Sequence, residues 1–211
     1  MPNPLETTAC GVTLGTDMST KGPNIKLILA ALAAIVMFSP PSGLAQPAQG
    51  GADAADEAAL LAELAEADAE RAPQIEARLQ AIWSRSGSPA MDLLLERGRR
   101  ALETGDAGAA LDHLGALTDH APDFAEGWHL RASAWFEAGR FGPALSDLER
   151  ALALNPSNYR AIYGLGMILE ELGDKAPALR AYRRAQAIAP QDAHIAAAVR
   201  RLQQAVGSRE L

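Results

Sequence analysis

Residues of three kinds recur along this chain at one fixed interval of 34 positions. Prolines stand at Pro122, Pro156 and Pro190, and a glycine and an alanine keep the same interval. These further positions are Gly105, Gly139, Gly173, Ala110, Ala144 and Ala178. A fixed period of this length indicates stacked units that bury their apolar faces against one another. We therefore predict three repeats, at residues 91–124, 125–158 and 159–192.

Each repeat is predicted to hold two helices, joined at the glycine and ended at the proline. Glycine readily adopts the left-handed conformation that ends many helices. Asp123 and Glu126 have capping-box spacing for the first helix of the second repeat. Hydrophobic residues make up 48% of the chain but aromatics only 5%, and the rest of the apolar content is mostly alanine, the best helix former. The fold class is therefore predicted as all-α.

The N-terminal 45 residues have the organisation of a secretory signal. Two lysines, Lys21 and Lys26, precede an uncharged apolar stretch over 27–38, and Gly43 and Ala45 provide the small residues of a cleavage site. This order of basic, apolar and small residues defines a signal peptide. We expect cleavage after Ala45 and a periplasmic mature protein.

Two alternatives stay open for this segment. An uncleaved signal would leave the chain anchored in the inner membrane, although the apolar stretch is short for a full span. Translation from Met18 instead of Met1 gives a better-proportioned basic region, and would leave out Cys10, the chain's single cysteine. The sequence does not choose between these starts.

Three more segments flank the repeats. Residues 46–56 are rich in glutamine, glycine and alanine without periodicity, and are predicted to be a flexible linker. Apolar residues at helical spacing predict a hairpin of two helices over 57–88. Residues 193–206 are predicted to form a helix that caps the last repeat with a polar outer face.

The search for chemistry finds no catalytic, cofactor-binding or metal-binding motif. No two of the four histidines have i, i+4 spacing on a helix, and a single cysteine excludes a cysteine-based zinc site. The net charge of −7 argues against nucleic acid as a partner, because phosphate binding needs concentrated positive charge. The chain is therefore predicted not to be an enzyme and to need no cofactor.

The repeats resemble those of the tetratricopeptide repeat family. The second repeat, AEGWHLRASAWFEAGRFGPALSDLERALALNPSN, carries the tryptophan, alanines, aromatic, leucine and proline in the family's places. The sequence around PDFAEGW and ALNPSNY also resembles that of exported repeat proteins of alphaproteobacteria. The seventh position departs from the family's leucine, being Arg97 and Arg131 in the first two repeats. The first repeat is loosely filled, and we expect the preceding hairpin to cover it.

This resemblance implies a right-handed superhelix of antiparallel helix pairs whose first helices line a concave groove. Residues at the family's groove positions form the candidate peptide site: Arg99, His129, Ser133, Phe136, Arg160, Tyr163 and Met167. Family members that clamp the C-terminal carboxylate of chaperones use a pattern that only Arg160 matches, so the clamp is not expected here. Two arginines, two aromatics and a methionine suit a peptide with apolar side chains and some negative charge.

The favoured hypothesis is a periplasmic protein-interaction module that holds a segment of an envelope protein in this groove. The alternative is a structural subunit of an envelope complex, recruited through Ile75, Leu79 and Trp83 of the hairpin, with an empty groove. The sequence specifies neither the partner nor the pathway nor the oligomeric state.

Overall fold

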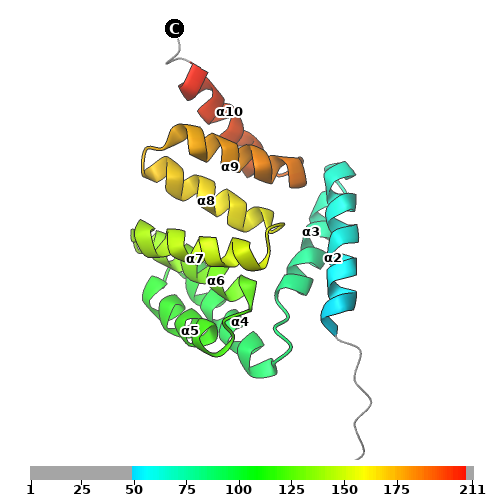
Figure 1. The fold of residues 1–211 in the computed structure, drawn as a ribbon, viewed down its shortest axis with the longest axis vertical. Coiled ribbons are helices and arrows are strands. Elements are labelled where there is room, and N and C mark those ends of the chain that lie inside the picture. The colour runs from blue at the N-terminus through cyan, green and yellow to red at the C-terminus, as the bar shows by residue number, and fades with distance from the viewer. Residues whose placement is uncertain (1–48, 208–211) are drawn as a thin grey trace, which may run out of the picture. The chain divides into compact units, whose positions relative to one another are not determined.

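A computed structural model describes residues 49–207, and every regular element in that range is an α-helix (Figure 1). In chain order these are α2 (Gln49–Glu66), α3 (Ala72–Trp83), α4 (Pro89–Glu103), α5 (Ala107–His120), α6 (Ala125–Glu137), α7 (Phe141–Leu154), α8 (Tyr159–Glu171), α9 (Lys175–Ile188) and α10 (Ala193–Gly207). The predicted all-α class is confirmed for this part of the chain. The predicted signal at residues 1–45 lies outside it. Within 49–207 no helix is both long and apolar enough to cross a membrane.

The helices repeat with the period of the sequence. The second helices of the three repeats, α5, α7 and α9, begin at 107, 141 and 175, each 34 residues after the last. Gly105, Gly139 and Gly173 stand between the paired helices with φ of 73°, 70° and 87°. These values lie in the left-handed region that side chains disfavour, so the predicted role of these glycines is confirmed.

Small residues allow the two helices of a repeat to approach closely. A Cβ atom at Gly98 would lie 2.4 Å from Leu114, and one at Gly166 would lie 2.5 Å from Tyr182. Both distances are too short for a real contact, so the partner side chain takes the space that a larger residue would need. Ala144 is fully buried in the corresponding interface of the second repeat.

A repeated polar contact joins each repeat to the next. Arg150 donates to the carbonyl oxygen of Pro122 at 3.1 Å, and Arg184 makes the same bond to Pro156 at 2.8 Å. The arginine and the proline each recur after one period, so one inter-repeat contact is used twice. At the C-terminal end, α10 packs Val199 and Leu202 into one cluster with Tyr182, as a terminal capping helix would.

Two predictions about the N-terminal part are wrong. Residues 49–56 belong to α2 and are not a flexible linker, because alanines favour helix and the helix they start packs onto α3. The hairpin of α2 and α3 also does not cover the first repeat. Its Ile75 and Leu79 share one apolar cluster with Tyr159 of α8 and Ala185 of α9.

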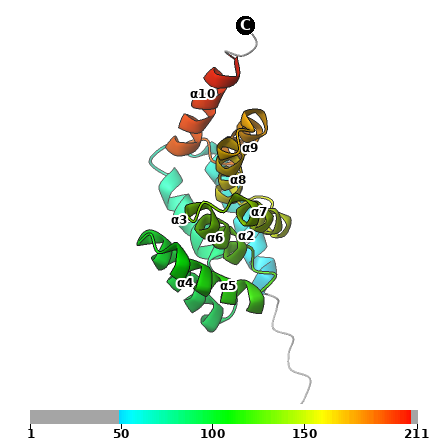
Figure 2. The same cartoon turned by 90° about the vertical axis from the view of Figure 1, so that its left-hand side faces the viewer.

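The hairpin therefore lies along one edge of the stack. This edge contains the starts of α6 and α8. In Figure 1 the hairpin is at the right, and it runs across the ends of the stacked helices. Glu57 of α2 accepts hydrogen bonds from Trp83 at 2.6 Å and from Asn155 at 2.8 Å, which ties the hairpin to the loop before α8. The turn between α8 and α9 lies at the opposite edge, which faces the viewer in Figure 2.

Candidate functional site

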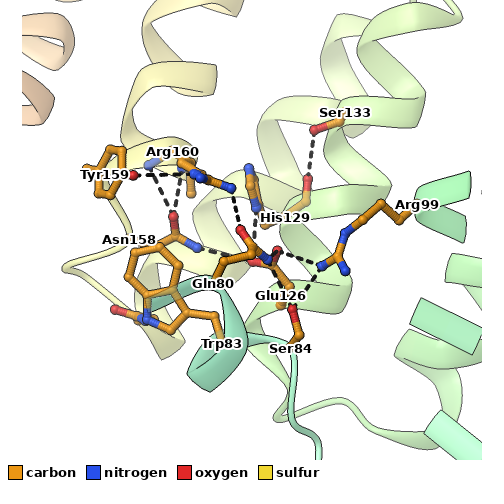
Figure 3. A network of polar contacts seen from close by, with 12 residues as sticks. Gln80, Trp83, Ser84, Arg99, Glu126, His129, Ser133, Asn158, Tyr159 and Arg160 are labelled. Carbon is orange, nitrogen blue, oxygen red and sulfur yellow. Dashed lines mark hydrogen bonds and ion pairs between the residues drawn. The ribbon is translucent and has the colours of Figure 1, made fainter. Parts of the chain in front are cut away.

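The first helices of the repeats, α4, α6 and α8, line one face, and Glu126 in the first turn of α6 is buried at its hairpin side. Nε2 of Gln80 donates to Oε1 of Glu126 at 2.9 Å, and Nδ2 of Asn158 donates to Oε2 at 3.3 Å. Nδ1 of His129 lies 3.1 Å from Oε2, and the guanidinium of Arg99 lies 3.6 Å from Oε1. Figure 3 shows Glu126 at the centre of these partners. The predicted capping box is wrong, because Phe124 precedes α6 and its side chain caps nothing.

The network holds Glu126 as a carboxylate. Burial by itself would raise the pKa of Glu126, but the charge and hydrogen bond of His129, with Gln80 and Arg99, lower it below its ordinary value. A buried charge is tolerated only when paired and hydrogen-bonded, and this carboxylate meets both conditions. Its role in the fold is therefore structural.

Gln80 of α3 joins the hairpin to two repeats at once. Its amide nitrogen reaches Glu126, and its Oε1 accepts a hydrogen bond from the guanidinium of Arg160 on α8 (Figure 3). Nearby, the guanidinium of Arg99 donates to Oγ of Ser84 at 3.0 Å. Both arginines of the predicted groove are thus bound within the chain.

A pocket of about 250 Å³ opens further along the same face, between α6 and α8. Its side chains from α6 and α8 include His129, Ser133, Phe136, Glu137 and Met167. Leu148 of α7 also lines it. Gly164 lines the wall on α8, and a Cβ there would meet only Leu148, at an ordinary 3.7 Å. The pocket is mainly apolar and would hold one side chain of a bound peptide.

The structure separates the predicted groove residues into three groups. His129, Ser133, Phe136 and Met167 line the pocket together. Arg99 and Arg160 instead face the hairpin. Tyr163 packs its ring 5.3 Å from that of Tyr182 and joins the apolar clusters on both sides of it. That the pocket set binds a peptide stays a prediction.

The comparisons with known proteins agree with the helix pairs. The tetratricopeptide repeat family matches residues 95–142 and 135–202, which together span all three repeats. This chain is a tetratricopeptide repeat protein. A tetratricopeptide repeat-containing protein of Rhizobium etli is 33% identical over 127 residues, which are 60% of this chain and 62% of that protein. A co-chaperone of Cryptococcus neoformans with tetratricopeptide repeats and a J domain is 30% identical over 106 residues, or 49% of this chain and only 20% of its own length. The chain thus spans less than two thirds of either relative.

Solved tetratricopeptide repeat structures share the fold. The first such domain of Spaghetti (RPAP3), bound to the HSP90 peptide SRMEEVD, is 28% identical with a TM-score of 0.55, over 57% of this chain and 98% of that one. The first such domain of human RPAP3 is also 28% identical, with a TM-score of 0.54, over 57% and 95%. MamA is 25% identical with a TM-score of 0.53, over 59% and 73%.

The structure explains one departure from the tetratricopeptide repeat pattern. Arg131, at the seventh position of the second repeat, donates to both carboxylate oxygens of Asp147 at 2.7 Å. It also donates to Thr118 at 2.6 Å and lies over the ring of Trp128. The hydrogen bond and the charge of Asp147 raise the pKa of Arg131 above its ordinary value, although burial acts to lower it. A bidentate ion pair replaces the family's leucine there.

Sequence reasoning missed the two hairpin residues that meet the groove, Gln80 and Ser84. Two of their partners in the repeats, Arg99 and Arg160, were predicted as groove residues. Gln80 follows Leu79 in α3, a helix whose buried residues form an apolar face. A polar residue next to that face could have been predicted to contact whatever the face packs against. Nothing in the periodicity says which repeat that face covers.

Proposed function

We propose that this tetratricopeptide repeat protein is a protein-interaction module that holds a peptide segment of its partner against α6 and α8. The observation that carries the proposal is the apolar pocket between these helices, which Gly164 leaves unfilled. The peptide-bound Spaghetti domain, which shares the fold, supports a role in binding peptides. An apolar side chain of the partner would enter between Phe136 and Met167.

The alternative hypothesis, recruitment through the hairpin, requires side chains that are buried in this fold. Ile75, Leu79 and Trp83 are each less than 8% exposed, at 3%, 0% and 7%, because they pack inside the chain. Recruitment through these side chains would require the hairpin to leave the repeats. Binding through the open pocket requires no such rearrangement, which is why we favour it.

The test is to fill the pocket without disturbing the fold. Gly164→Leu places a side chain where the pocket opens, and its Cβ makes only an ordinary contact. Gly115→Leu is the matched control, since Gly115 lies within α5 and a Cβ there meets nothing within 4 Å. Both variants replace a helical glycine and should fold as well as the wild type or better.

We expect wild type and Gly115→Leu to capture the same proteins from an envelope extract, and Gly164→Leu to lose them. Cross-linking followed by mass spectrometry would measure the recovery. Equal recovery by a folded Gly164→Leu variant would show that the partner binds elsewhere.

We propose further that the partner is met in the periplasm. The support is the signal-like organisation of residues 1–45, with cleavage after Ala45. Mass spectrometry of the protein from the envelope fraction should then find Gln46 at the N-terminus. An intact N-terminus in the membrane fraction would favour the inner-membrane anchor instead.

A further inference from the structure

The two arginines of the groove, Arg99 and Arg160, already have partners within the chain. The charges of the groove that lack a partner among the described residues are therefore negative. Arg160 donates to Gln80, and its guanidinium lies 5.9 Å from the centre of the Tyr159 ring. Arg99 donates to Ser84 and lies 3.9 Å from Glu96 and 3.6 Å from Glu126. Neither arginine is left to attract an acidic peptide.

Three free carboxylates stand at the other ends of the same helices. Glu103, Glu137 and Glu171 are the last residues of α4, α6 and α8, one period apart, and all three are exposed. Within residues 49–207 none of them forms an ion pair or a side-chain hydrogen bond. These three glutamates are called the acidic row, and its middle member, Glu137, also lines the pocket.

The acidic row is unfavourable for the stability of the helices on which it lies. The C-terminus of a helix has a negative partial charge, so a carboxylate there destabilises the helix and a cation there stabilises it. Next to the row, Glu170 is neutralised by Arg201 at 2.6 Å, and Arg140 lies over the ring of Trp135. The row's three charges are left without such a partner in the described chain.

The spacing of the row fits an extended chain. α4 contacts α6 and α6 contacts α8, and packed helices lie about 8–10 Å apart. A peptide in the extended polyproline II conformation has three residues per turn and rises about 3.1 Å per residue, so side chains three residues apart lie on one face about 9 Å apart and match successive carboxylates.

We propose that the groove binds an extended basic segment of a protein, with one apolar side chain in the pocket and lysines or arginines about every third residue against Glu103, Glu137 and Glu171. The inference rests on the proposed function and specifies its partner. It reverses the partially acidic peptide expected from the sequence, because that expectation relied on Arg99 and Arg160.

The test uses a fluorescent synthetic peptide of about nine residues, with a central leucine and with lysines placed three residues apart. Matched peptides carry glutamine or glutamate in place of lysine, or alanine in place of leucine. We expect the lysine peptide to bind the full chain about tenfold more tightly than the glutamine peptide, and the glutamate peptide to bind least. Raising the salt concentration should remove most of this preference, because the carboxylates are exposed.

A triple variant then locates the charge. Glu103→Gln, Glu137→Gln and Glu171→Gln together should abolish the preference for lysine. The control triple variant, Glu66→Gln, Asp112→Asn and Glu149→Gln, removes the same charge from exposed positions elsewhere and should keep it.

Each remaining outcome overturns the inference. Equal binding of the lysine and glutamine peptides would do so, and if Gly164→Leu still abolished that binding, the pocket and the proposed function would stand. Loss of the preference in both triple variants would show a general effect of net charge. Absence of binding by every peptide would reject the basic segment, whereas capture of partners by Gly115→Leu and not by Gly164→Leu would still support the pocket.

Discussion

Two glutamates of α6 differ completely in their surroundings although both lie on the face that a ligand would meet. Glu126 in the first turn is 3% exposed and is surrounded by Gln80, His129, Asn158 and Arg99. Glu137, the last residue of the helix, is exposed on the rim of the pocket. The chain itself occupies one end of its groove and leaves the other open. A residue's position in the repeat therefore indicates the face it lies on, but not whether a ligand can reach it.

The largest effect should come from removing the carboxylate at the closed end. Glu126→Ala leaves Arg99, Gln80 and Asn158 without their shared acceptor, and breaking a buried ion pair costs about 3–5 kcal/mol. We expect a loss of this size in the free energy of unfolding, measured by urea denaturation. Glu137→Gln is the control on the same helix and should change it by less than about 0.5 kcal/mol. Similar losses in the two variants would contradict the contrast between the two ends.

Lowering the pH should remove the stabilisation by the Glu126 carboxylate gradually. Because the pKa of Glu126 is lowered in the folded state from its ordinary 4.5, its stabilisation is complete above that pH and is lost as the pH falls through the lower, folded value. The stability difference between wild type and Glu126→Gln should therefore not shrink between about pH 7 and pH 5, and should shrink below that range. Denaturation series of both proteins would measure it. A difference that shrinks above pH 5 would mean that the carboxylate is not held in its charged form.

Two glycines of α8 offer a finer comparison. Gly166→Ala would place a Cβ 2.5 Å from Tyr182 and should destabilise the chain by about 1–3 kcal/mol through overpacking. Gly164→Ala on the pocket wall meets only an ordinary contact, and should be neutral or stabilise by up to about 1 kcal/mol through reduced backbone entropy of the unfolded chain. Thermal melts would rank them. A destabilised Gly164→Ala would show that the pocket is already filled by neighbouring side chains.

A modest loss of stability is expected from truncating Met167 in the pocket. Met167 is only partly buried and lies between the pocket and the cluster under α10. Met167→Ala should cost less than the 2–5 kcal/mol usual for a fully buried methionine, about 1 kcal/mol. The same variant should weaken binding of the leucine-containing peptide several-fold, as measured by fluorescence polarisation. Binding at the wild-type level would move the apolar contact to Phe136 alone.

The repeats were predictable from sequence because their cause is local and periodic. Gly105, Gly139 and Gly173 end helices wherever they stand, and the space beside Gly98 and Gly166 is needed by their own repeat. The place of the hairpin was not predictable in this way. Leu79 and Trp83 belong to an apolar face, but such a face could pack on the first repeat as well as on the third. The hydrophobic effect is non-directional, so it does not specify which repeat the face covers.

The site shows the same division. His129, Ser133, Phe136 and Met167 line one pocket because the family's groove positions follow from helix geometry. Arg99 and Arg160 follow that geometry too, yet Ser84 and Gln80 bind them from a distant part of the sequence. The charge of the open groove could therefore not be read from groove positions alone.

The hydrogen bond between Glu57 and Asn155 joins residues that are 98 positions apart. Arrays of repeats ordinarily have only near-neighbour contacts, so they fold from any point and fray from either end. In this chain the hairpin closes a large loop onto the third repeat, which raises the mean sequence separation of contacts. We expect slower folding than in an open array of three repeats, because loop closure must precede these contacts. The first repeat, enclosed within that loop, should lose the freedom to unfold by itself.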